Sequence, residues 1–336
     1  MFKRIVFTLF FITGIGIGLG LSARHTALQT QMPQEALAAS QGAEESLPNP
    51  SPPPVTPTTQ PVTPTVVPEI SAFGSVDAPV EDVASVLQAM KVLEKQQRIL
   101  WSQNGWLHIV RSSYHAPAPD EASPLFSMDG YENGEDWFRL ENGYLWDGFS
   151  RTTDRQGHSL QETVTLPDGL NVHLTLWESG DHAQAVTQAD GEWPLEMAPD
   201  SGAVKEYISL LQDAGKPFQI RMWQETGDNI IVTITYPLDM PAEDFSQMTG
   251  YDGKGQPQSA TMFWSFSAKD GTLRTSEMRY ALLLPDGNQE TWPVSQESIT
   301  IYEVLPELPA EARATWKAFQ ERAQDARNFV AQEHTP

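Results

Sequence analysis

The chain has 336 residues, of which 40% are hydrophobic, and a formal net charge of -23. This length and hydrophobic content suffice for one large or two small folded domains. The acidic excess repels phosphate backbones and anionic lipid surfaces, so no nucleic-acid partner is expected. The absence of cysteine excludes disulfides, thiolate metal sites, cysteine nucleophiles and a lipid-modified cysteine, so any membrane attachment has to come from a helix.

Residues 1–25 have the pattern of an export signal. Lys3 and Arg4 precede nineteen uncharged residues, Ile5 to Ala23, which as a helix extend about 28 Å, close to the thickness of a bilayer core. No convincing cleavage site follows them. We expect an uncleaved anchor with its two cations in the cytoplasm, and a removed signal peptide is the alternative. Either interpretation places the remaining chain outside the cytoplasm. It is then either anchored in a cell envelope, with the N-terminal helix as its one membrane contact, or secreted.

Residues 26–79 have the composition of a disordered stalk. The stretch from Leu47 to Pro68 contains nine prolines and five threonines. Such a stretch favours extended polyproline II and acts as a semi-rigid spacer. We expect it to hold a folded body away from the membrane, and recognition of the prolines by a partner is the alternative.

The folded body is expected over residues 80–305. It begins with an amphipathic helix that ends at Asn104-Gly105. Short runs rich in aromatic and β-branched residues follow, separated by turn residues, which indicates an antiparallel meander. The five predicted strands cover 106–114, 135–140, 143–151, 159–166 and 170–178.

The pattern then restarts, with a helix at 203–215 and five more strands at 218–225, 229–236, 260–268, 272–284 and 297–305. Both halves, 80–180 and 203–305, place "LPDG" between their fourth and fifth strands, at residues 166–169 and 284–287. The same offset aligns Trp146 with Trp264. Duplication is one explanation, and chance recurrence of a common turn is the other. A mostly polar helix is expected over 306–336.

Alternation along the strands places apolar residues on one face, which has to be covered by helices or by curling of the sheet. Large aromatic side chains on such a face either fill a core or line a pocket for an apolar ligand. The residues expected to contact such a ligand are Trp106, Val110, Phe138, Leu140, Trp146, Val172, Leu174, Met222, Trp264 and Phe266.

The order of elements, together with runs such as "GWLHIVRSSY" and "FWSFSAKDGTLRTSEMRYALLLPDG", resembles the LolA-like lipoprotein carrier superfamily over residues 80–305. The resemblance implies an α+β fold in which a long curved antiparallel β-sheet forms an incomplete barrel with packed helices. It also implies a concave apolar face that accepts acyl chains, without catalytic residues. The anchor and the stalk depart from the soluble carriers and favour a fixed receptor or sensor.

Enzyme motifs with useful specificity are absent from the sequence, and we expect no catalytic residue, metal or cofactor. His108 shares a strand face with Trp106 and Val110, which favours a hydrogen-bonded interior histidine over a metal ligand. The acidic stretch 129–136 lacks the spacing of an EF-hand calcium loop, so a solvated hairpin is expected there.

The sequence therefore predicts a non-enzymatic, extracytoplasmic binding protein for a lipid-like or apolar ligand. The first alternative is a sensory or surface interaction module with a filled core and an envelope protein as its partner. The second is an extracytoplasmic hydrolase, which would need two carboxylates about 5 to 10 Å apart in a cleft.

Overall fold

The computed structural model describes residues 72–116, 130–176, 182–188, 194–225, 227–249, 251 and 253–333. The predicted anchor and most of the predicted stalk lie outside these residues. Within the described ranges, no helix has the length and apolar character needed to cross a membrane.

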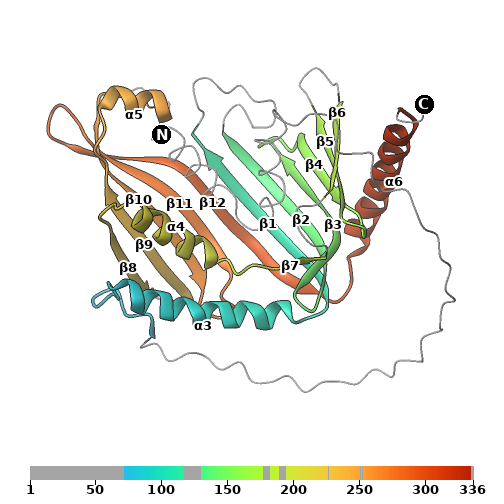
Figure 1. Ribbon diagram of the computed structural model, residues 1–336, viewed down its shortest axis with the longest axis horizontal. Coiled ribbons are helices and arrows are strands. Elements are labelled where there is room, and N and C mark those ends of the chain that lie inside the picture. Colours follow the sequence, from blue (N-terminus) through green and yellow to red (C-terminus); the bar gives the residue numbers. More distant parts are fainter. Residues whose placement is uncertain are drawn as a thin grey trace.

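One large antiparallel sheet dominates the described part of the chain, which also has four helices packed around the sheet (Figure 1). The helices are α3 (Val83–Trp101), α4 (Gly202–Asp213), α5 (Ala242–Thr249) and α6 (Ala310–Glu333). The strands of the first half are β1 (Gly105–His115), β2 (Tyr131–Glu141), β3 (Tyr144–Thr153), β4 (Ser159–Thr165), β5 (Leu170–Leu176), β6 (His182–Gln188) and β7 (Leu195–Glu196). Those of the second half are β8 (Gln219–Gln224), β9 (Asn229–Pro237), β10 (Gln256–Ser267), β11 (Leu273–Leu283) and β12 (Gln289–Leu305).

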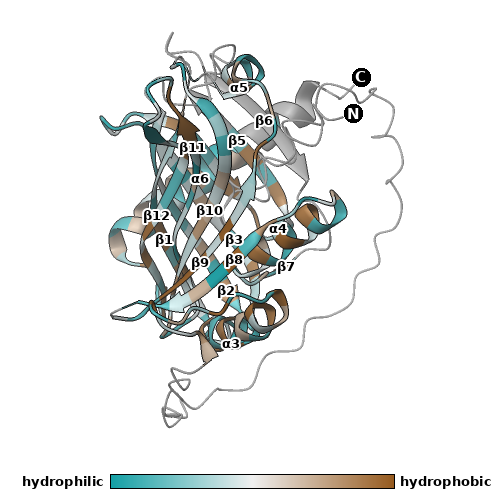
Figure 2. Ribbon diagram, turned by 90° about the vertical axis from the view of Figure 1, so that its left-hand side faces the viewer, coloured by the Kyte–Doolittle hydropathy of each residue, from teal (hydrophilic) through white to brown (hydrophobic). Residues whose placement is uncertain are grey.

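The strands follow the order β6-β5-β4-β3-β2-β1-β12-β11-β10-β9-β8, and the short β7 pairs with β3. The first and last long strands, β1 and β12, are therefore neighbours at the middle of the sheet. The sheet is open and curved (Figures 1 and 2). The α+β class and the curved antiparallel sheet with packed helices are thus confirmed.

Helices α3 and α4 lie across one face of the sheet, which we call the inner face (Figure 1). The carboxylate of Asp82 accepts a hydrogen bond from the Ser85 backbone N–H at 2.8 Å and caps α3 at its start. Val86, Met90 and Leu93 recur at helical spacing and are fully buried against the sheet.

The inner face is filled by side chains of the strands, α3, α4 and α5. Tyr207 of α4 packs edge-on against Trp264 of β10, with ring centroids 5.7 Å apart. Phe245 of α5 packs edge-on against Tyr280 of β11 at 4.8 Å. These contacts join the helices to the sheet in one hydrophobic core.

Helix α6 covers the opposite, outer face of the sheet over β2 to β5. Trp316 and Phe319 of α6 enter a second, smaller core with Trp137, Phe149 and Val172. Phe319 is 1% exposed, and its ring meets Phe149 edge-on at 5.2 Å. Most of the other described side chains of α6 are exposed.

Turn chemistry explains the tight hairpins. Asn142 and Gly143 between β2 and β3 both have positive φ, 54° and 82°, as a type I′ turn requires. Both "LPDG" stretches close hairpins, β4–β5 and β11–β12, and in each the glycine N–H donates to the carbonyl of the leucine three residues earlier. The duplication itself stays a prediction, and its other anchor does not match in environment, because Trp146 is half-buried whereas Trp264 is buried.

The sequence pattern missed β6, β7 and α5. Strand β6 reads "HAQAVTQ", which lacks the aromatic and β-branched enrichment of a strand. Helix α5 has eight residues, too few for a stripe of apolar positions to stand out.

Candidate functional site

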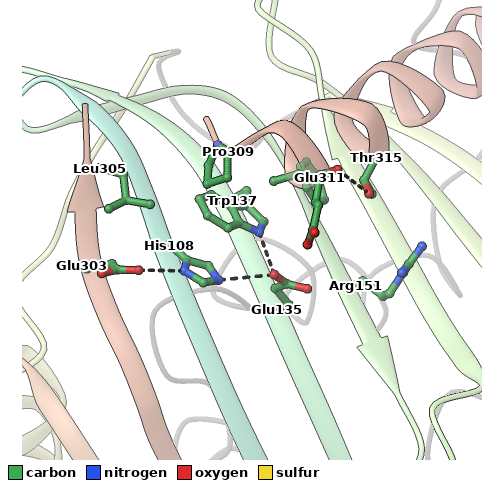
Figure 3. Close-up of a pocket in the computed structure, with 11 residues that line it drawn as sticks. His108, Glu135, Trp137, Arg151, Glu303, Leu305, Pro309, Glu311 and Thr315 are labelled. Carbon is green, nitrogen blue, oxygen red and sulfur yellow. Dashed lines mark hydrogen bonds and ion pairs between the residues drawn. The ribbon is translucent and has the colours of Figure 1, made fainter. Parts of the chain in front are cut away.

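A cleft lies on the outer face, where the start of α6 crosses β1, β2 and β12 (Figure 3). Its volume is about 430 Å³. The residues that line it are His108, Glu135, Trp137, Phe149, Arg151, Glu303, Leu305, Pro309, Glu311, Ala312 and Thr315.

His108 lies at the centre of the cleft between two carboxylates. Its Nδ1 is 3.1 Å from Glu303 Oε1, and its Nε2 is 3.3 Å from Glu135 Oε1. The imidazole stacks on the Trp137 indole, with ring centroids 3.7 Å apart and planes 10° apart. The indole N–H of Trp137 donates to Glu135 Oε1 at 2.8 Å. Imidazole, indole and two carboxylates therefore form one connected cluster (Figure 3).

Strand register creates this cluster. His108 is the direct cross-strand partner of Trp137 on β2 and of Glu303 on β12. Side chains of directly paired residues lie on the same face of a sheet, so all three point outward. Glu135 precedes Trp137 by two residues and shares that face.

The charges of the cluster reinforce one another. Burial lowers the pKa of His108, but hydrogen bonds and charges from Glu135 and Glu303 outweigh burial and raise it above 6.5. The hydrogen bond from His108 lowers the pKa of Glu135 below its ordinary value, against the effect of burial. Glu135 is therefore ionised at neutral pH, and His108 holds its proton more tightly than a free histidine.

A second charged group holds α6 beside the cleft. The carboxylate of Glu162 on β4 forms ion pairs with two guanidinium groups. Its Oε1 lies 3.2 Å from Arg151 Nη2, and its Oε2 lies 2.8 Å from Nη1 of Arg322 on α6. The guanidinium carbons of Arg151 and Arg322 lie 5.4 Å and 4.4 Å from the centre of the Phe319 ring. This arrangement places α6 at a fixed position over β3 and β4.

The cleft combines charged side chains with an apolar wall. Glu135, Glu303 and Glu311 supply three carboxylates, against the imidazole of His108 and the guanidinium of Arg151. The apolar wall consists of Trp137, Phe149, Leu305, Pro309 and Ala312. Among the described residues, no group of three or more His, Cys, Asp or Glu side chains has the geometry to hold a metal ion.

The structure separates the ten residues predicted to contact a ligand. Phe138, Leu140, Met222, Trp264 and Phe266 lie in the filled core of the inner face. Val172 lies in the core under α6, and Trp106 packs at its margin. Val110 is half-buried, Trp146 is half-buried beside Arg139, and the side chain of Leu174 lies outside the described residues. Of those whose side chains are described, none lines the cleft.

The residues of the cleft were accessible to sequence reasoning only in part. His108 was expected to be a hydrogen-bonded interior histidine, and it is 8% exposed and bonded through both ring nitrogens. Glu135 and Glu303 carried no signal, because nothing in the alternation identifies β12 as the neighbour of β1.

Comparison with known proteins leaves the family open. No family model matches the chain, and no curated protein matches it. A β-barrel-like protein of Brucella abortus from a domain family of unknown function, DUF1849, is 12% identical, with 60% of this chain and 99% of that chain covered and a TM-score of 0.17. An N-terminal dehydratase from the difficidin assembly line is 8% identical, with 74% and 91% covered and a TM-score of 0.14. Matches this weak carry no argument about function, and the resemblance to LolA-like carriers is not confirmed.

Proposed function

We propose that this protein is a non-catalytic, extracytoplasmic binding protein whose cleft under α6 takes an amphiphile with a cationic head group. The observation that carries the proposal is that the cluster of His108, Glu135 and Glu303 and an apolar wall line the same cleft. An ammonium head would bind Glu135 and Glu303, and its apolar part would lie along Trp137 and Leu305.

The charged residues of the cleft indicate that the head group of the ligand is positive. Three carboxylates line the cleft against one imidazole and one guanidinium, and Arg151 is already paired with Glu162. A cationic head gains charge-assisted hydrogen bonds, whereas a fatty-acid carboxylate meets like charges. A cleft of about 430 Å³ is in the usual range for small-molecule sites.

A binding role fits the cluster better than catalysis. A general base needs a free nitrogen near its substrate, but both nitrogens of His108 already bond to carboxylates. The two carboxylates flank an imidazole, which occupies the space that a glycosidic bond would require. Glycoside hydrolysis also requires a general acid of raised pKa, whereas the pKa of Glu135 is lowered.

The site differs from the inner face that the sequence favoured. A carrier needs an unfilled apolar face, and the described part of the inner face is packed with side chains from α3, α4 and α5. The sequence favours a lipid-like or apolar ligand, and the outer cleft would provide such a ligand with a site for a charged head group.

Calorimetric titration with two ligands of equal chain length tests the proposal. We expect the full-length protein to bind hexylammonium and to bind hexanoate at least tenfold more weakly. The double variant E135Q/E303Q should lose tenfold or more in hexylammonium affinity, because a hydrogen bond to a charged group contributes about 1.5 to 3 kcal/mol. E243Q on α5 removes an exposed carboxylate away from the cleft and serves as the matched control. Equal binding of both ligands, or an unchanged affinity in E135Q/E303Q, would contradict the proposal.

The extracytoplasmic location rests on the N-terminal pattern at Lys3, Arg4 and the apolar stretch after them. A C-terminal fusion to alkaline phosphatase, which is active only outside the cytoplasm, tests it. We expect activity in the fusion and its loss when residues 1–25 are deleted. An inactive fusion of the full-length chain would refute the location.

A further inference from the structure

The exposed face of α3 is basic, in a chain whose overall charge is -23. Lys91, Lys95 and Arg98 are spaced at i, i+4 and i+7 and are all exposed. Residues at this spacing lie along one side of a helix. Ile99 lies beside them and is 60% exposed. Together with Glu94 and Ser102, these four residues line a shallow depression of about 370 Å³ on the surface.

The cations of this face are largely free to meet a partner. Lys91 and Lys95 form no ion pair with another described residue. Arg98 lies 3.7 Å from Glu196, but both side chains are more than half exposed, and exposed pairs contribute little. The one carboxylate in the depression, Glu94, is paired with Lys205 of α4 and accepts a hydrogen bond from Ser201 at 3.0 Å.

Two further acidic residues lie at the other end of α3, away from the basic face. Glu81 pairs with Arg221 at 3.2 Å, and the Asp82 carboxylate caps the helix. Charges that are farther away than the Debye length of about 8 Å are screened at physiological salt. The basic face is therefore a local exception to the acidic charge of the whole chain.

We propose that this basic face of α3 docks on an anionic lipid surface. Charge complementarity with lipid phosphates favours this occupant. The position of the helix favours it as well, because α3 is the first helix of the described residues, and the chain before it contains the stretch from Ile5 to Ala23 that is expected to be a membrane anchor. A tether of this kind raises the effective concentration of lipid at the helix, which favours docking even of a face with few cations.

The absence of native cysteine makes a site-specific test clean. The full-length protein is placed in nanodiscs, either zwitterionic or containing a third of phosphatidylglycerol, with a fluorophore on Q88C, which lies on the same side of α3. A lipid carrying a quencher on its head group reports contact. We expect at least threefold more quenching in the anionic discs, and we expect 0.5 M salt to abolish the difference.

Two further variants serve as the control and as the test of the three cations. E243C labels α5, at the opposite end of the sheet (Figures 1 and 2), and should give low quenching in both lipids. K91Q/K95Q/R98Q in the Q88C background should reduce the quenching in anionic discs to the zwitterionic value. Equal quenching in both lipids, or no effect of the triple substitution, would overturn the proposal. Disulfide cross-linking between two Q88C chains in detergent would overturn it too, because the occupant would then be a second copy.

Discussion

His108 and Trp137 are direct cross-strand partners on β1 and β2, and their rings stack 3.7 Å apart. The indole also donates its N–H to Glu135, so a single side chain positions both the imidazole and one of its carboxylates. We expect W137F to keep the packing but lose this hydrogen bond, at a cost of about 1 to 2 kcal/mol in unfolding free energy. W137A, which also empties the core under α6, should cost about 3 to 5 kcal/mol. Urea denaturation measures both, and equal losses in the two variants would show that the N–H has no role.

The raised pKa of His108 predicts how cation binding depends on pH. Below this pKa the protonated imidazole bonds to Glu135 and Glu303 and competes with a cationic ligand. As the pH rises through the pKa, the imidazole loses its charge and the two carboxylates become available. Hexylammonium affinity should therefore increase from pH 6 upward in the native protein and stay flat in H108Q. Calorimetry at four pH values checks this, and a native affinity that is constant or falls with pH would contradict it.

His108 also makes the stability of the fold depend on pH, with the opposite sign: stability decreases as the pH rises, whereas hexylammonium affinity increases. A histidine whose folded pKa lies above its unfolded value stabilises the fold fully below pH 6.5, and the contribution is lost as the pH rises through the folded pKa. Both glutamates are about half exposed, which limits the effect to about 1 kcal/mol. Urea midpoints of the native protein and H108Q should differ more at pH 5.5 than at pH 8.5.

The sequence predicts only part of this site, because the alternation of apolar and polar residues shows which residues of a strand share a face and nothing more. The outward face of β1, with Trp106, His108 and Val110, was predictable because a strand repeats every two residues. The partner Glu303 was not, because it lies 195 residues away from His108 in the chain. Alternation assigns residues to faces, but it does not say which strands are neighbours or which helix covers which face.

The same limit explains the scattered ligand residues. Trp106 and Trp264 each belong to an apolar face of a strand, and the sequence treated both faces as one concave wall. In the fold, Trp264 lies under α4, whereas Trp106 packs on the α6 side. Trp106 and Trp264 can be assigned to opposite faces of the sheet only when the position of α6 is known. The thin apolar edge of α6 does not indicate which part of the sheet the helix covers.

Phe319 tests whether α6 can leave the sheet without unfolding the protein. Its side chain is buried in the small outer core, which is a separate cluster from the inner core. F319A should cost about 3 to 5 kcal/mol of local packing and increase hydrogen exchange in α6. Exchange in α3 and α4 should remain as in the native protein. Equal acceleration in all three helices would mean that the two cores unfold together.

Asp200 provides the last prediction, because it is a carboxyl group in the wall between α3, α4 and β11. Its Oδ2 accepts the Leu273 backbone N–H at 2.7 Å, and its own N–H donates to Gln97 at 2.9 Å. Burial raises the pKa of Asp200 from 3.8 to about 7, and the nearby carboxylates Glu297 and Asp270 add to this effect. The folded state thus binds a proton that the unfolded state releases near pH 4.

The sign of the resulting pH dependence is opposite to that of a salt-bridged aspartate. Stability from the protonated form is complete below about pH 4, declines as the pH rises to about 7, and is constant above that. The total loss has an upper limit on the order of 4 kcal/mol. D200N keeps the oxygen that accepts the Leu273 N–H but cannot ionise, so its urea midpoint should decline less between pH 4.5 and 7.5. D213N, at the exposed end of α4, is the matched control and should follow the native curve. A D200N curve parallel to the native one would mean that Asp200 is ionised in the fold, with a cation or water beside it.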